Sequence, residues 1–299
     1  MAENNNDIYI YQRLCFDISK QFTKAYSTSF FSATRFFNRD IRYAIHSIYG
    51  FVRLADEIVD SFHGFPQQKL LQRFQEDYYI ARDQGISTNP ILQSFLHTVE
   101  KYGIPDEYIH SFLKSMHVDL KKKEYKTLIE TKQYIYGSAD VVGLMCLKVF
   151  SENNDSLFES LHIPAMRLGS AFQKVNFLRD LRKDVFILGR NYFPNLAIKN
   201  FDENSKNEII KDIEEDFKIA YSGIIKLPSN SRLAVMVAYR YYLKLLKKIK
   251  KTPSHKIISK RVRVSNLKKF VLLSDITLKQ IFTRNWINDK WCKYSTISR

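Results

Sequence analysis

Cysteine is scarce in this 299-residue sequence, and its three cysteines stand far apart. Cys15, Cys146 and Cys292 are odd in number and form no CxxC pair, so the sequence indicates neither a disulfide framework nor a thiolate zinc site. Such usage is typical of a reducing compartment, and the polar first residues do not resemble a secretory signal. We therefore expect a cytoplasmic protein.

Glycine is also scarce, and no long hydrophobic run occurs. The longest uncharged apolar stretch covers positions 141–147, far short of the roughly 18 to 20 residues that span a bilayer. Any membrane contact is therefore expected to be peripheral. Alternating strand patterns are lacking as well, which excludes a sheet-based architecture.

Apolar residues recur at spacings of 3 and 4, and seven prolines divide the chain into segments of helical length. No repeat or low-complexity linker interrupts the sequence. We predict one all-α domain over 1–299, with a core of about 15–285, built around a central cavity. The predicted helices cover 7–23, 40–62, 67–84, 89–101, 105–124, 128–150, 165–188, 205–226, 230–251 and 265–284, with Pro164 placed at a helix boundary.

Acidic residues are too few to balance the basic ones, which leaves a formal net charge of +16. This charge favours an anionic partner: nucleic acid, acidic lipid or a phosphorylated substrate. The basic run 244–269 is either a solvated face or a surface that rests on anionic membrane lipid, and it contains no recognisable nucleic-acid-binding motif. The 22 Phe and 18 Tyr either fill the core or line a large apolar cavity.

A first acidic cluster lies in positions 42–60. A helical step of 100° puts Tyr49, Arg53, Asp56 and Asp60 on one narrow stripe. Two carboxylates at i and i+4 repel each other unless a cation lies between them, and Mg²⁺ prefers such oxygen ligands. Taken alone, this pair is a weak signal that fits an ordinary solvated helix surface better than a metal site.

A second cluster follows the same helical logic, because Gln173, Asn176, Asp180 and Asp184 recur at steps of 3, 4 and 4. Apolar residues occupy the other faces of this segment, where unpaired carboxylates would be costly. Two such faces suggest a site in which Mg²⁺, or alternatively Mn²⁺, clamps a diphosphate as a leaving group. The carbocation left behind would need an apolar cavity that excludes water.

Four segments together resemble the squalene/phytoene synthase family in wording, order and separation. They are YSTSFFSAT at 26–34, FVRLADEIVD at 51–60, YIYGSADVVGLM at 134–145 and FQKVNFLRDLRKDVFILGRNYFP at 172–194. The resemblance covers most of the chain and is greatest to bacterial phytoene synthases. It implies an all-helical isoprenoid-synthase fold and the head-to-head (1'-1) joining of two prenyl diphosphates.

The resemblance also implies roles for individual residues. The positions that match the metal-binding motifs are Asp56, Asp60, Asn176, Asp180 and Asp184. The positions that match diphosphate-binding residues are Ser27, Ser29, Tyr49, Arg53, Gln173, Arg179 and Arg263. The catalytic positions comprise the four aspartates together with Tyr134 and Tyr192, which match residues near the reacting carbons.

Two acidic residues do not follow directly from the resemblance. Glu57 stands where many relatives have a second aspartate, but it points about 100° away from Asp56, so we expect little change in metal binding. Asp140, within the third motif, has no assigned role.

The expected activity is that of a phytoene synthase, which joins two geranylgeranyl diphosphates through a cyclopropyl (prephytoene) diphosphate without NADPH. The alternative is a squalene or dehydrosqualene synthase that uses farnesyl diphosphate, with NADPH required for squalene. A more remote alternative is a non-catalytic assembly factor of the same fold, which would be expected to have lost the metal ligands.

Overall fold

The structure, a computed structural model, describes residues 2–194, 201–259 and 261–262. Helices and the loops between them make up the described residues, which contain no strand and only one isolated bridge, between Glu124 and Asn191. The prediction of an all-α protein is confirmed. The helices are α1 (Ala2–Tyr26), α2 (Thr28–Thr34), α3 (Arg39–Asp60), α4 (Gln67–Gln84), α5 (Pro90–Tyr102), α6 (Asp106–Lys121), α7 (Leu128–Ile135), the π-helical turn η1 (Tyr136–Asp140), α8 (Val141–Ser151), α9 (Asp155–Phe186), α10 (Glu203–Ile224), α11 (Ser229–Lys250) and α12 (Ser254–Ser259).

Side-chain caps explain why several helices begin where they do. Asn38 accepts a hydrogen bond from the Ile41 amide at 2.9 Å at the start of α3, and Asn154 does the same for Leu157 in α9. These caps satisfy amides that have no partner within the helix. At the other end, Gly103 closes α5 in the left-handed conformation that glycine adopts easily.

The prediction that a helix begins after Pro164 is wrong, because α9 runs from Asp155 through Pro164. The strong cap at Asn154 starts the helix ten residues earlier, and the proline ring packs against α10. Gly223 of α10 lies so close that a Cβ there would come 2.3 Å from the Cβ of Pro164. Close packing between the two long helices compensates for the hydrogen bond that proline removes. The short helix α2 was not predicted, and the predicted helix 265–284 lies outside the described residues.

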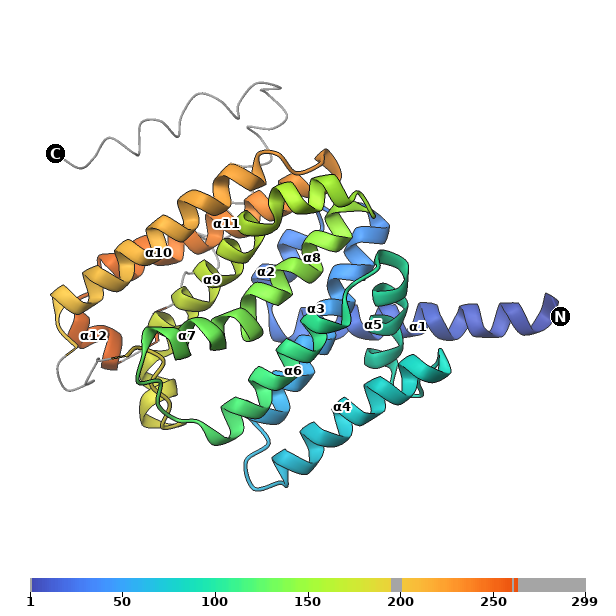
Figure 1. Cartoon of the computed structure of the whole chain (residues 1–299), viewed down its shortest axis with the longest axis horizontal. Helices are drawn as coiled ribbons and strands as arrows, with labels where there is room; N and C mark the ends of the chain where they lie inside the picture. The colour runs from blue at the N-terminus through green and yellow to red at the C-terminus, as the bar shows by residue number, and fades with distance from the viewer. Residues whose placement is uncertain (1, 195–200, 260, 263–299) are drawn as a thin grey trace.

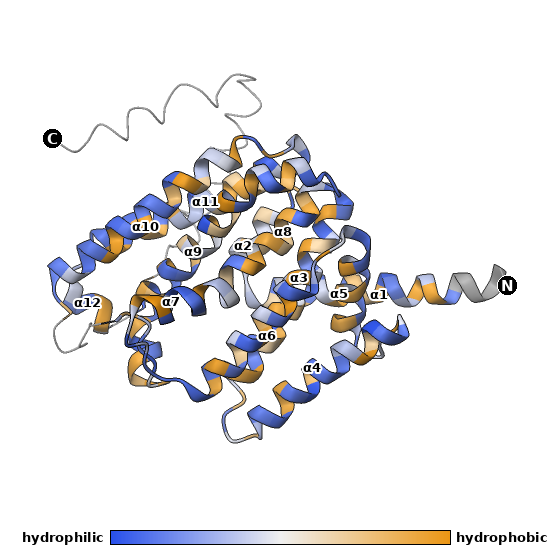
Figure 2. Cartoon of the chain, viewed as in Figure 1, coloured by the Kyte–Doolittle hydropathy of each residue, from blue (hydrophilic) through white to orange (hydrophobic). Residues whose placement is uncertain are grey.

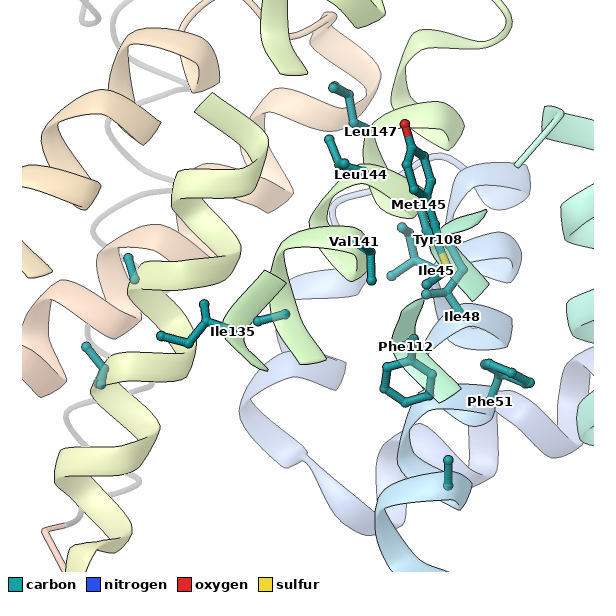
Figure 3. Packing of buried hydrophobic residues seen from close by; sticks show 14 of the residues in the cluster. Ile45, Ile48, Phe51, Tyr108, Phe112, Ile135, Val141, Leu144, Met145 and Leu147 are labelled. Atoms are coloured by element: carbon teal, nitrogen blue, oxygen red, sulfur yellow. The ribbon is translucent and has the colours of Figure 1, made fainter. Parts of the chain in front are cut away.

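The hydrophobic core lies where α3, α6 and α8 meet (Figure 3). Phe51 of α3 is fully buried and stacks on Phe95 of α5, with ring centroids 4.0 Å apart. Phe112 of α6 and Leu144 of α8 are also fully buried. Because truncation of such a ring leaves a cavity, Phe51→Ala would cost about 3 to 5 kcal/mol of stability.

Two glycines allow α9 to approach the η1 and α8 segment closely. A Cβ on Gly169 would lie 2.5 Å from the Ala139 carbonyl oxygen, and one on Gly143 would lie 2.7 Å from that of Ala165. Any larger residue would push the helices apart. These contacts hold α9, which carries the second acidic cluster, in a fixed register against the core.

Figure 1 shows the amino-terminal part of α1 projecting from one side of the molecule, with α7, α12 and the carboxyl end of α9 on the opposite side. In Figure 2 the outer helices α4 and α10 carry long hydrophilic stretches, as expected for solvated faces. None of the described helices is long and apolar enough to span a membrane.

Candidate active site

The first acidic pair lies on the last turns of α3. Asp56 and Asp60 are one turn apart, as the sequence predicted, and both are half-buried. Desolvation and the neighbouring charge of Asp60 raise the pKa of Asp56 to about 7, against the opposing effect of Arg53. Such crowding of carboxylates is what a divalent cation would relieve.

The second acidic pair lies on the last turns of α9. Asp180 accepts hydrogen bonds from Nε and Nη2 of Arg179 at 3.0 and 2.5 Å, and Nε of Arg261 lies 2.6 Å from its other oxygen. Desolvation, followed by the charges of Asp180 and Asp60, raises the pKa of Asp184 to about 7. This pair is therefore also crowded.

Arg190 joins the two acidic helices. This buried side chain, four residues beyond the end of α9, donates to Asp60 of α3 at 2.6 Å. Lys183 of α9 lies 3.9 Å from the same carboxylate. The structure thus brings the predicted aspartates of α3 and α9 to one place.

Ser27 and Tyr49, two of the predicted diphosphate-binding residues, lie together where α2 meets α3. Ser27 caps α2 by accepting from the Phe30 amide at 3.4 Å, and the ring of Tyr49 stacks on Phe30 with centroids 5.1 Å apart. Burial raises the pKa of Tyr49 to about 12, so its hydroxyl remains protonated at neutral pH. Ser29 is half-buried in α2.

Arg53 is held on two sides. Its guanidinium carbon lies 4.7 Å from the ring centroid of Tyr26, and it forms an ion pair with Glu57 one turn further along α3. Glu57 is therefore a partner of Arg53 in this structure. Stacking and pairing together fix the direction of the guanidinium.

One of the remaining polar residues of the second cluster, Asn176, contacts α11. Asn176 accepts a hydrogen bond from the Tyr242 hydroxyl at 3.3 Å, and the Tyr242 ring stacks on Phe172 with centroids 3.8 Å apart. Gln173 is half-buried on the same helix. Tyr242 was missed by the sequence analysis because it stands in a segment whose most visible feature is its lysines.

Tyr134 and Tyr192, predicted near the reacting carbons, form one aromatic stack beside the aspartates. Their ring centroids lie 5.1 Å apart, and Phe177 of α9 stacks on Tyr192 at 4.1 Å. Tyr125 packs against both tyrosines, at 5.0 and 5.5 Å. The rings are buried, so this wall of the site is shielded from bulk solvent.

Asp119 of α6 is the main site residue that the sequence analysis missed. It accepts a hydrogen bond from the Tyr134 hydroxyl at 2.5 Å and a longer one from Tyr192 at 3.5 Å. Burial raises its pKa to about 7, although Arg190 acts in the opposite direction. One signal could have found it, because Asp119 shares the buried helical stripe of Met116, three residues earlier.

Two further predictions concern single residues. Arg263 lies outside the described residues, whereas its neighbour Arg261 reaches Asp180. Asp140, which had no assigned role, is buried in η1 and accepts a hydrogen bond from the Ser170 hydroxyl of α9 at 2.7 Å. Its position, between helices that pack closely, is structural rather than part of the acidic site.

The donor set fits a magnesium ion that shares its ligands with a substrate. Within the described residues, no three His, Cys, Asp or Glu side chains are grouped closely enough to hold a metal alone. Magnesium needs no such cage, because it is commonly held by one or two carboxylates together with phosphate oxygens and water. Burial, followed by the charge of neighbouring carboxylates, raises the pKa values of Asp56 and Asp184, and a bound cation would offset both effects.

The sequence profile of the family described as "Squalene/phytoene synthase" matches residues 23–268. The chain belongs to the squalene/phytoene synthase family. This is a family of head-to-head prenyltransferases, so the prediction from the four motifs is confirmed at that level.

The chain is similar in sequence to proteins that are named phytoene synthases. The chloroplastic phytoene synthase of an Oncidium hybrid cultivar is 28% identical over 86% of this chain and 66% of its own length. The phytoene synthase of Arthrospira platensis is 26% identical over 86% and 91% of the two chains. The 15-cis-phytoene synthase of Pantoea ananas is 24% identical over 73% and 77%.

Solved structures share the fold. A dehydrosqualene synthase in complex with a ligand superposes with a TM-score of 0.78, at 19% identity, over 91% of this chain and 98% of its own. The squalene synthase HpnC from Alicyclobacillus acidocaldarius gives 0.70 at 20% identity, over 81% and 95%. These similarities confirm the predicted isoprenoid-synthase fold, whereas the predicted central cavity stays a prediction.

Proposed function

We propose that this protein is a Mg²⁺-dependent phytoene synthase. It joins two geranylgeranyl diphosphates head to head through a cyclopropyl (prephytoene) diphosphate. The observation that carries the proposal is the meeting of two acidic pairs: Asp60 of α3 is tied to the end of α9 by Arg190 at 2.6 Å. The aromatic stack of Tyr134, Phe177 and Tyr192 lies beside this junction.

Oxygen donors for the metal would come from both helices. The proposed ligands are Asp56, Asp60, Asn176, Asp180 and Asp184. When bound, Mg²⁺, or Mn²⁺ in its place, would stabilise the departing diphosphate.

Cationic and hydroxyl groups would hold the diphosphate itself. Arg53 and Arg179 offer forked donors that match phosphate oxygens, and Ser27 and Tyr49 offer hydroxyl donors nearby. The other proposed diphosphate-binding residues are Ser29, Gln173 and Arg263. Because Arg53 and Arg179 are paired with carboxylates in this structure, substrate oxygens would compete with those carboxylates for the guanidinium groups.

The aromatic stack would protect the cation that forms when diphosphate leaves. Its ring faces attract positive charge, and its burial keeps out water that would otherwise trap the cation. Asp119 accepts hydrogen bonds from both tyrosine hydroxyls. These bonds fix the ring positions and direct the hydroxyl protons toward Asp119.

Donor length is supported by the relatives rather than by the geometry. The phytoene synthase names of the curated relatives favour geranylgeranyl diphosphate, at 24% to 28% identity. The likeness in fold to dehydrosqualene and squalene synthases motivates the alternative, a synthase that uses farnesyl diphosphate. Retention of both aspartate pairs argues against a non-catalytic assembly factor, and the absence of a nucleic-acid-binding motif in the sequence argues against a nucleic-acid partner.

One assay separates these alternatives. The purified chain is incubated with either geranylgeranyl or farnesyl diphosphate and Mg²⁺, with and without NADPH, and the hydrocarbon is identified by mass spectrometry. We expect phytoene from the longer donor, with no requirement for NADPH. A product from farnesyl diphosphate alone would establish the alternative, and no product from either donor would contradict the enzymatic proposal.

A further inference from the structure

Four large apolar side chains stand exposed at two places far apart in the sequence. Leu128 and Ile129, at the start of α7, are 66% and 68% exposed. Phe186, at the end of α9, and Ile187, directly after it, are 63% and 71% exposed. We refer to these four residues as the apolar rim. Exposure of this kind costs free energy in water, so it points to a surface that is covered during function.

Hydrogen bonds hold the two segments that carry the apolar rim side by side. The segment after α9 runs beside the segment before α7. The backbone amide of Tyr125 donates to the Asn191 carbonyl at 3.1 Å, and the backbone amide of Asn191 donates to the Lys123 carbonyl at 2.8 Å. The Thr131 hydroxyl donates to the Tyr192 carbonyl at 3.1 Å. In Figure 1 the start of α7 and the end of α9 accordingly lie at the same side of the molecule.

Exposed cations surround the apolar rim. On the α6–α7 side Glu124 is exposed, whereas Glu130 is paired with Lys122 at 3.0 Å. On the α9 side Asp184, two residues before Phe186, is half-buried, and Asp180 is paired with Arg179 and Arg261. Acidic residues thus neutralise only part of the local charge. The exposed basic side chains next to the rim are Lys121, Lys123, Lys126, Lys132, Arg182 and Lys183.

We propose that the apolar rim and these basic side chains form a docking surface for an anionic lipid bilayer. Aliphatic and aromatic side chains enter the acyl boundary while lysines pair with the headgroups, the combination by which peripheral proteins bind charged membranes. Charge complementarity selects this occupant over a neutral apolar partner. The proposal goes beyond the enzymatic function and does not depend on it.

A second exposed apolar stretch provides a comparison. Tyr9, Ile10 and Leu14 on the projecting helix α1 are 53% to 58% exposed. Arg13 lies among them, but Asp17 follows one turn later, so the charge there is nearly balanced. An anionic bilayer therefore has no electrostatic reason to choose α1.

Docking through the apolar rim would place the candidate site against the bilayer. Phe186 follows Asp184 by two residues, and Lys183 lies 3.9 Å from Asp60. A long-chain hydrocarbon formed at such a site would be released next to lipid rather than into water. Arg261, which follows α12, contacts Asp180 and adds a half-exposed cation near the same end of α9.

Vesicle flotation of the full chain without substrate tests the proposal. The vesicles contain phosphatidylglycerol and phosphatidylcholine in equal parts, or phosphatidylcholine alone, at about 50 mM and about 500 mM salt. We expect binding to the anionic vesicles at low salt that is lost at high salt. The double variants Leu128→Ser/Ile129→Ser and Phe186→Ser/Ile187→Ser should each weaken it at least about tenfold.

Matched controls make the result decisive. Ile80→Ser/Ile86→Ser removes two exposed isoleucines, 52% and 44% exposed, from α4 and the loop after it, and should change binding less than about twofold. Circular dichroism of every variant checks that the helices remain. Absence of binding to anionic vesicles, or loss of binding in Ile10→Ser/Leu14→Ser but not in the rim variants, would overturn the proposal. Because no substrate is present, failure here leaves the synthase assay unaffected.

Discussion

The acidic ends of α3 and α9 look alike in sequence but are stabilised differently. In each pair one carboxylate is ion-paired, Asp60 on α3 and Asp180 on α9. In each pair the other carboxylate, Asp56 or Asp184, has a pKa raised to about 7 by desolvation and crowding. Both helices therefore present one neutralised and one unrelieved carboxylate.

The partners of the paired carboxylates differ in origin. Asp60 is bound by Arg190, a buried residue that follows the opposite helix. Asp180 is bound by its own neighbour Arg179 and by the half-exposed Arg261. A long-range bond thus ties α3 to α9, whereas the pairing on α9 is mostly local. We therefore expect the pairing of Asp60 on α3 to require the folded arrangement of distant segments. The pairing of Asp180 on α9 should depend mainly on residues close to it.

The largest expected effect comes from removing either paired carboxylate. If both helices bind the metal, Asp60→Asn and Asp180→Asn should each reduce turnover by about 10³-fold or more, because each removes a carboxylate that would hold the Mg²⁺ that stabilises the leaving group. Turnover is measured with Mg²⁺ and the active donor. Asp155→Asn, on the first turn of α9 with its side chain 85% exposed, is the matched control and should retain activity. Near-normal activity in either site variant would show that only one helix is needed.

The next largest effect on turnover should come from Asp119, because it accepts hydrogen bonds from both tyrosines of the aromatic stack. Asp119→Asn is expected to reduce turnover by about 10²-fold, since it weakens the hydrogen bonds that hold the rings. Tyr134→Phe removes one of the same bonds. If Asp119 and Tyr134 act as a unit, turnover of the double variant should be only slightly lower than that of the more impaired single variant. Additive losses in the double-mutant cycle would mean that Asp119 acts independently of Tyr134.

Alanine variants of Arg190 and Arg261 test whether the α3 and α9 ends are stabilised differently. Arg190→Ala leaves Asp60 without its buried partner and should lower the free energy of unfolding by about 3 kcal/mol. Arg261→Ala removes an ion pair whose basic side chain is half-exposed, so the loss should stay below about 1 kcal/mol. Urea unfolding followed by circular dichroism measures both. Equal losses would contradict the view that only the α3 end is tied to the distant chain.

The acidic helices could be predicted from the sequence because helical periodicity places Asp56 with Asp60 and Asp180 with Asp184. Packing between distant segments of the fold could not be predicted in this way. Pro164 looked like a helix boundary, since the close approach of Gly223 that accommodates it depends on a helix about 60 residues later. Asp119 was missed for the same reason, because its tyrosine partners are 15 and 73 residues away.

The roles of individual site residues follow from resemblance more than from physics. A stripe of carboxylates predicts a metal-binding face, but nothing in the local pattern says that Arg190 would pair with Asp60, 130 residues earlier. The choice between two donor lengths depends on the shape of the apolar space. That shape is set by side chains from many helices and has no local signature.

The prediction furthest from the two acidic pairs concerns Asp140, a buried aspartate beside α9 that belongs to neither of them. Burial raises its pKa to about 7, well above its value in an unfolded chain, so the folded state binds the extra proton. Its contribution to stability is therefore present at low pH and is lost as pH rises toward 7. Asp140→Asn retains an oxygen that can accept from Ser170 and has no charge to bury. Relative to the unsubstituted chain, this variant should gain about 2 kcal/mol between pH 5 and pH 8 in urea unfolding without metal. A stability difference that is the same at both pH values would show that Asp140 does not titrate in this range. Added Mg²⁺ is the control, and it should leave the difference unchanged because Asp140 lies outside both acidic pairs.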